Sequence, residues 1–249
     1  FERWYRLTVR SAYETKNYKK CVEMANQAMA MNIKWHYRNA YWIRIYRAKA
    51  NLALGNYEEC EHEYLTLQSQ FFDSDYYRTL YQIQAGQEKY REANVYLLYD
   101  VYISGYDKNQ KSLYNMLLNA AKIAGHDKAV SLLEALIAKL NQEAGKEATV
   151  EEAYANMDSG EIYDRMIDEV TRHLDLYIER KTGKVVHYNE EKELGSIAVG
   201  GQPSIFFRQA DFIYDEEVRR YERVDFTEMK TYDRKKQTIT SKAVLIMES

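Results

Sequence analysis

Residues 54–64 read LGNYEECEHEY, and two further stretches carry a similar pattern: KNYKKCVEMA at 16–25 and EKYREANVYL at 88–97. Aligned on their tyrosines, the three stretches place Cys21, Cys60 and Ala93 three positions after the tyrosine. The copies lie 33 to 39 residues apart, which is the spacing of helical-hairpin repeats. The pattern therefore predicts pairs of helices, with a corner between the two helices of each pair.

A fourth copy, AGHDKAVSLLEAL at 124–136, places Ala129 in the small-residue column. A small residue lets two helices approach closely where they cross. Gly55 and Gly125 are expected to end the first helices of their hairpins, because glycine adopts the left-handed backbone of a helix end at low cost. Cys21 and Cys60 share the small, buried column, so we expect inert thiols of the core.

These residues resemble the tetratricopeptide repeat family, whose pattern Gly55, Tyr57, Cys60 and Tyr64 match. The first and third copies depart from that pattern, with Lys16 and Glu88 at the glycine position. The resemblance covers residues 1–145 and implies a superhelical, all-α solenoid. It also implies a role as a protein-binding scaffold, in which the first helices of the hairpins line a concave groove.

Composition excludes several classes of protein. Apolar residues make up 46% and charged residues 29% of the 249 residues, as in a folded chain rather than a disordered one. The net charge of −3 does not fit a dedicated nucleic-acid binder. Two cysteines and no long apolar run favour a cytoplasmic protein without a membrane span. The chain starts at Phe1 rather than methionine, as a processed chain or a fragment would.

Basic residues recur at the positions expected to face the groove, although the chain as a whole is acidic. Such a groove would bind an acidic peptide or protein partner, and nucleic acid is the less favoured ligand. The balancing acids Glu58, Glu59, Glu61 and Glu63 are expected on a second helix, facing outward. The predicted binding residues are Arg6, Arg10, Lys49, Arg78, Lys111 and Lys122, with Arg3 beside them.

From residue 146 onward the pattern changes. Thr149 and Glu152 have the spacing of a capping box, which predicts a helical stretch to about Arg180, with a break near Asp158–Gly160. The expected apolar stripe on this stretch comprises Tyr163, Met166, Ile167, Val170, Leu174 and Tyr177.

Residues 184–249 favour strands, because β-branched and aromatic residues alternate there with polar ones. Expected turns lie at 189–193, 200–203 and 215–217, with a hairpin corner at 233–236. The expected fold class is α+β: a helical-repeat domain at 1–145, connecting helices at 146–183, and a small, mainly antiparallel module at 184–249.

An alternative function comes from ADFIYD (210–215) followed by VDFTEMK (224–230). These stretches resemble the metal-binding core of the PD-(D/E)xK nucleases. The resemblance implies Asp211 and Glu228 as ligands of Mg²⁺ and Lys230 as the catalytic lysine. The leading hypothesis needs no cofactor, and it interprets Glu228 and Lys230 as a charge pair on the solvent face of a strand.

Overall fold

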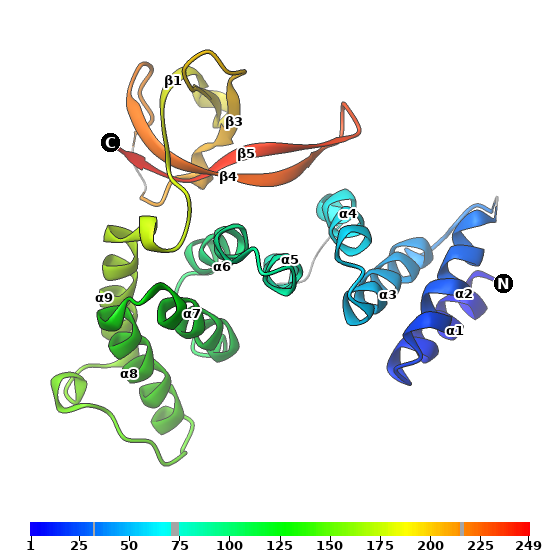
Figure 1. Ribbon diagram of the computed structural model, residues 1–249, viewed down its shortest axis with the longest axis horizontal. Helices are drawn as coiled ribbons and strands as arrows, with labels where there is room; N and C mark the ends of the chain where they lie inside the picture. The colour runs from blue at the N-terminus through cyan, green and yellow to red at the C-terminus, as the bar shows by residue number, and fades with distance from the viewer. Residues whose placement is uncertain (32, 71–74, 215–216) are drawn as a thin grey trace. The chain divides into compact units, whose positions relative to one another are not determined.

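The computed structural model describes residues 1–31, 33–70, 75–214 and 217–249 of the chain. Two compact units form. One comprises Phe1–Tyr90 with Lys230–Ser241, and the other comprises Arg91–Met229 with Lys242–Ser249. Within the described ranges, nine α-helices precede five strands (Figure 1). The α+β class is thus confirmed. None of the helices in those ranges is long and apolar enough to cross a membrane.

The helices follow the predicted hairpins. The tyrosines Tyr18 and Tyr57 begin α2 and α4, the second helices of the first two pairs, and Tyr90 begins α6. Helix α1 packs against both α2 and α3, and α3 packs against α4. The helices are α1 (Glu2–Glu14), α2 (Tyr18–Ala30), α3 (Asn39–Leu54), α4 (Tyr57–Leu67), α5 (Tyr76–Gly86), α6 (Tyr90–Ser104), α7 (Lys111–Ala124), α8 (Asp127–Glu143) and α9 (Ser159–Arg172).

All four corners share one backbone geometry. Lys16, Gly55, Glu88 and Gly125 have positive φ values of 58°, 79°, 61° and 67°. The next residue in each corner donates its N–H to the carbonyl five residues back, as Asn56 does to Asn51 at 2.9 Å. This bond satisfies a carbonyl at the end of the first helix that the helix itself leaves unpaired. The corner therefore forms even where lysine or glutamate replaces glycine.

We expect Lys16→Gly and Glu88→Gly to stabilise the chain by roughly 1 kcal/mol each, since a left-handed backbone costs an L-residue about 1–2 kcal/mol. Urea unfolding would measure the change in the free energy of unfolding. The control Gln27→Gly, in the exposed middle of α2, should instead destabilise the chain by about 0.5–1 kcal/mol. Loss of stability in both corner variants would contradict the shared geometry.

The small-residue column lies in the core, as predicted. Cys21, Cys60, Ala93 and Ala129 are all 0% exposed. Both cysteines are free, and burial raises the pKa of the Cys21 thiol to about 11 and that of Cys60 to about 12. Since the thiolate is the reactive form, these cysteines are inert packing residues.

Helix α6 is buried along most of its length. Every residue from Ala93 to Val101 is buried, the pattern of a helix enclosed on all sides. Its polar groups reach other parts of the unit. Asn94 donates to the Tyr177 carbonyl at 3.2 Å, and the Tyr99 hydroxyl donates to Asp211 Oδ1 at 2.7 Å.

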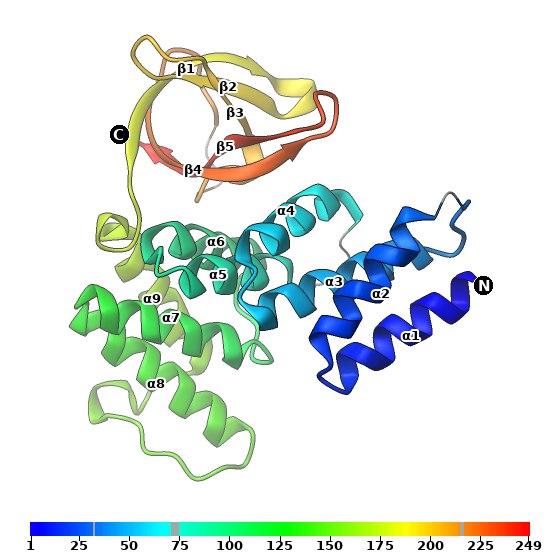
Figure 2. The same cartoon turned by 45° about the vertical axis from the view of Figure 1, so that its right-hand side comes forward.

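The five strands close on themselves in the order β1-β2-β3-β5-β4, with β4 pairing back onto β1 (Figure 2). They are β1 (Lys181–Asn189), β2 (Leu194–Ala198), β3 (Ile205–Arg208), β4 (Arg223–Asp233) and β5 (Thr238–Glu248). The pairs β1–β2, β2–β3 and β1–β4 are antiparallel, whereas β3 and β5 run parallel through Phe206 and Lys242. The sheet is therefore mixed, with one parallel pair in a mainly antiparallel arrangement.

The interior of the closed sheet is packed with side chains from several strands. Tyr188 and Phe207 stack at 6.2 Å with their rings 5° from parallel. A Cβ at Gly195 would lie 2.2 Å from the Phe207 ring, so this position on β2 requires glycine. The buried cluster also contains Val185, Ile197, Val218, Val224, Phe226, Ala243 and Ile246.

The turns around the sheet largely agree with the sequence. Asn189 accepts from the Lys192 N–H at 2.9 Å, and Asp233 accepts from the N–H groups of Lys235 and Lys236. A turn also lies at 200–203, with Gly201 at φ 76°. The turn predicted at 215–217 includes 215 and 216, which lie outside the described residues.

The prediction for 146–180 was wrong in its cap and in its extent. Thr149 and Glu152 form no capping box. The capping box forms at Asp158 and Glu161, and α9 runs from there to Arg172. Glu152 instead lies in a single 3₁₀ turn, Glu152–Tyr154, that buries no residue. A helix without a buried face gains little from tertiary packing, so only the part after Asp158 becomes helical.

The predicted apolar stripe is largely confirmed. Five of its six residues are buried, and Ile167 is half-buried. The division of the chain at 1–145, 146–183 and 184–249 stays a prediction, because the two compact units each combine segments from distant parts of the sequence.

Candidate functional site

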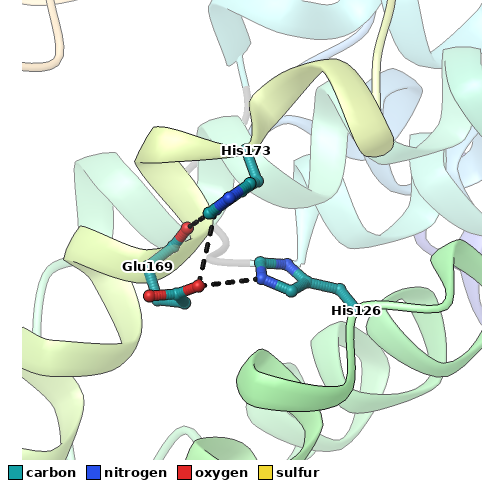
Figure 3. Close-up of side chains that lie close together, drawn as sticks. All are labelled: His126, Glu169 and His173. Carbon is teal, nitrogen blue, oxygen red and sulfur yellow. Dashed lines mark hydrogen bonds and ion pairs between the residues drawn. The ribbon is translucent and has the colours of Figure 1, made fainter.

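One cluster of metal-ligating residue types stands out in the described part of the chain. His126, Glu169 and His173 each offer a ligand atom, and these atoms all lie within 4.8 Å of one another (Figure 3). All three residues belong to the second compact unit.

The fourth hairpin corner positions His126. It follows Gly125 directly and is the N-cap residue of α8, with its N–H bonded to the Ala121 carbonyl at 3.0 Å. The residue is only 7% exposed. The equivalent residues of the first two corners are asparagines, Asn17 and Asn56. The fourth corner thus places an imidazole where the first two carry a short amide and the third carries Lys89.

Glu169 lies in the last turn of α9, and His173 directly follows that helix. Residues four apart share one face of a helix, which directs both side chains toward His126. Glu169 Oε1 lies 3.2 Å from His126 Nε2 and 3.5 Å from His173 Nδ1. The two imidazole rings meet edge to face, with centroids 4.8 Å apart.

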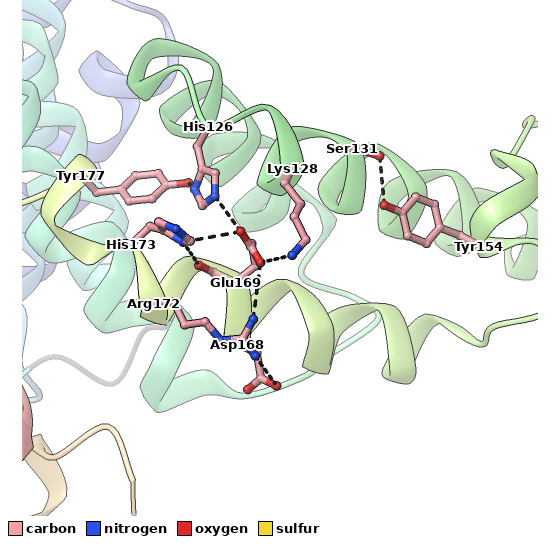
Figure 4. Close-up of polar contacts among 9 residues, drawn as sticks. All are labelled: His126, Lys128, Ser131, Tyr154, Asp168, Glu169, Arg172, His173 and Tyr177. Carbon is pink, nitrogen blue, oxygen red and sulfur yellow. Dashed lines mark hydrogen bonds and ion pairs between the residues drawn. The ribbon is translucent and has the colours of Figure 1, made fainter.

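The second carboxylate oxygen of Glu169 faces cations instead of imidazoles (Figure 4). Lys128 Nζ lies 2.6 Å from Oε2, and Arg172 Nη1 lies 3.6 Å from it. The hydrogen bond from Lys128 is the main reason why the pKa of Glu169 is lowered, and the bond to His126 acts in the same direction against burial. Glu169 is therefore a carboxylate whose Oε1 faces the two imidazoles and whose Oε2 faces the two cations.

A further contact orients the His126 ring. Its Nδ1 lies 2.9 Å from the hydroxyl of Tyr177, one helical turn beyond His173. Burial raises the pKa of Tyr177, so the hydroxyl stays protonated. Because a carboxylate can only accept, His126 Nε2–H donates to Glu169 Oε1, and in that tautomer Nδ1 accepts from the Tyr177 hydroxyl.

The sequence interpretation missed this cluster. The sequence patterns indicated neither His126 nor His173 as a candidate site residue. The spacing of Glu169, His173 and Tyr177, each four residues apart, was the available signal. His126 comes from a corner 43 residues before Glu169, and no local pattern connects them.

The structure distributes the six predicted groove residues over both units. Arg6 and Arg10 lie on α1, Lys49 on α3 and Arg78 on α5, whereas Lys111 and Lys122 lie on α7 in the second unit. Several have polar partners: Arg10 pairs with Glu14 at 2.7 Å, Arg78 with Asp75 at 3.5 Å and Lys122 with Glu134 at 2.7 Å. Lys111 donates to Asn141 at 2.6 Å.

The expected outward orientation of the acids on α4 was wrong for Glu63. Its side chain is 8% exposed and binds Arg44 and Arg47 of α3. Two guanidinium groups stabilise the buried charge, which would be costly without partners. Glu58 and Glu59 are exposed as expected, and Glu61 binds Lys230 at 2.8 Å.

The three predicted nuclease residues each have a different partner. Asp211 is buried and accepts from Lys242 Nζ and the Tyr99 hydroxyl, both at 2.7 Å. Its other oxygen accepts from the Arg208 N–H at 2.8 Å. Glu228 pairs with Lys181 at 2.7 Å and Lys230 with Glu61 at 2.8 Å, so the expected charge pair between Glu228 and Lys230 was wrong. Lys230 belongs to the first compact unit and Glu228 to the second. Asp211 thus has protein donors on both carboxylate oxygens, and the nuclease stays a prediction without structural support here.

Comparisons with protein-family models, curated proteins and solved structures gave no match for this chain.

Asp211→Asn should destabilise the chain by about 3–5 kcal/mol, because it leaves the Lys242 charge buried without its partner. The double variant Asp211→Leu/Lys242→Met removes both charges and should recover part of this loss. Urea unfolding measures both values. The control Glu228→Gln breaks a half-exposed pair and should cost less than about 1 kcal/mol. If Asp211→Asn kept full stability but lost Mg²⁺ binding, the nuclease prediction would gain support instead.

Proposed function

We propose that this chain is a protein-binding scaffold whose helical hairpins bind an acidic peptide segment of a partner. The observation that carries the proposal is the equivalence of Arg10 and Lys49. Each lies six residues before the left-handed residue of its corner, Lys16 and Gly55 respectively. The two basic side chains therefore occupy the same position on adjacent first helices, α1 and α3, which pack together.

A second equivalence extends the basic surface. Arg6 and Arg78 each lie ten residues before their corner residues, Lys16 and Glu88. Within the described ranges, neither Arg6 nor Lys49 forms an ion pair or a side-chain hydrogen bond, so both have donors available for a ligand. Carboxylates accept such donors in charge-assisted hydrogen bonds.

The proposal includes a tetratricopeptide-like superhelix with a concave basic groove, which the four matching corners support. It also includes a cytoplasmic location. Lys111 and Lys122, on α7 of the second unit, are further candidate binding residues, although each already has a partner on α8. Nucleic acid remains the less favoured ligand, because the net charge is −3.

A fluorescein-labelled octaglutamate peptide tests the proposal by fluorescence anisotropy. The double variant Arg10→Glu/Lys49→Glu should weaken binding about tenfold or more, since each reversal replaces an attraction of roughly 1 kcal/mol with a repulsion. Binding by the unaltered chain should also weaken as salt is raised, because the pairs are exposed.

The matched control is Lys19→Glu/Lys20→Glu, which reverses two exposed charges on the second helix α2. It changes the net charge by the same amount and should leave the affinity within about twofold. Equal losses in both double variants would show a nonspecific charge effect and contradict the proposal. Stronger binding to a single-stranded oligonucleotide of equal charge would point to nucleic acid instead.

A further inference from the structure

We propose that His126, Glu169 and His173 form a binding site for a divalent transition-metal ion, with Zn²⁺ as the ion that best suits the ligands. Two imidazoles and one carboxylate are a common ligand set for Zn²⁺. The inference does not depend on the proposed peptide binding.

The distances between the ligand atoms fit such an ion. In a tetrahedral site with bonds of about 2.1 Å, neighbouring ligand atoms lie about 3.4 Å apart. Glu169 Oε1 already lies 3.2 Å from His126 Nε2 and 3.5 Å from His173 Nδ1. The two histidine nitrogens form the remaining ligand pair and lie within 4.8 Å of each other. They must move to a similar separation when the ion binds.

The surroundings also fit a metal-binding histidine. Metal-bound imidazoles usually donate their other N–H to an oxygen, which fixes the ring and its tautomer. The Tyr177 hydroxyl, 2.9 Å from His126 Nδ1, accepts this N–H once a metal at Nε2 has moved the ring proton to Nδ1. His173 Nδ1 now lies 3.0 Å from the Glu169 carbonyl, and its side chain is 46% exposed. Metal binding through Nδ1 therefore moves the proton of this ring to Nε2.

Lys128 and Arg172 determine how tightly the ion binds. Both contact Glu169 Oε2, whereas Oε1 faces the imidazoles. The Lys128 side chain is 66% exposed, so it can leave the carboxylate when the ion arrives. Its positive charge nevertheless opposes a dication nearby. Lys128 is thus expected to weaken the affinity of the site for the metal ion, and removing its charge should strengthen that affinity.

A bound ion would connect two parts of the second unit. His126 belongs to the corner between α7 and α8, whereas Glu169 and His173 lie at the end of α9, just before β1. A ligand that binds only the folded state stabilises that state. Three protein ligands leave a fourth position for water or for an atom of another molecule.

The test uses the full chain after treatment with a chelator. Titration with Zn²⁺ in a calorimeter should show one saturable site per chain, and the Tm should rise with the concentration of Zn²⁺. Co²⁺ at the same site should give the visible absorption bands of a four-coordinate ion. His173→Asn and Glu169→Gln should each weaken binding at least about tenfold, whereas Lys128→Gln should strengthen it.

His187→Asn is the matched control, because His187 is an exposed histidine on β1 outside the cluster. It should bind Zn²⁺ as the unaltered chain does. Circular dichroism of the metal-free variants establishes that they fold, and His173→Asn is informative even if Glu169→Gln unfolds. Absence of a saturable site, or an affinity that His173→Asn leaves unchanged, would overturn the proposal.

Discussion

The helical part of this protein depends on one hydrogen bond, repeated at four corners. In each corner a residue with positive φ ends the first helix, and the next N–H returns to the carbonyl five residues back. This bond sets the start of the second helix and hence the register of the small-residue column that the pair buries. It also fixes the place of His126, whose own N–H makes the bond at the fourth corner. The candidate metal site is therefore a variation of a corner that the chain uses throughout.

Much of this architecture could be predicted from local patterns. The tyrosine and small-residue columns are short-range signals, and they identified the beginnings of α2, α4 and α6 as well as the burial of Cys21 and Cys60. Glycine predicted the corners at Gly55 and Gly125. The left-handed backbones of Lys16 and Glu88 could be inferred only from the repeat, because neither residue type favours positive φ.

Predictions failed where the outcome depended on distant contacts. Two pairs of residues, Thr149 with Glu152 and Asp158 with Glu161, have the spacing of a capping box. Only the second precedes a segment that buries an apolar face, and burial decides between them. Distant contacts also explain why Glu63 and Asp211 are buried and paired, because their basic partners come from other helices and strands. The parallel pairing of β3 with β5 likewise depends on strands that are not neighbours in the sequence.

The most direct measurement of the repeated corner is amide hydrogen exchange, followed by NMR under native conditions. We expect slow exchange for the corner amides of Asn17, Asn56, Lys89 and His126, because each donates to a helix carbonyl within 3.0 Å. If these four amides exchanged as fast as those of the segment 147–150, which lies outside any helix or strand, the hairpin corners and the site built on the fourth would be contradicted.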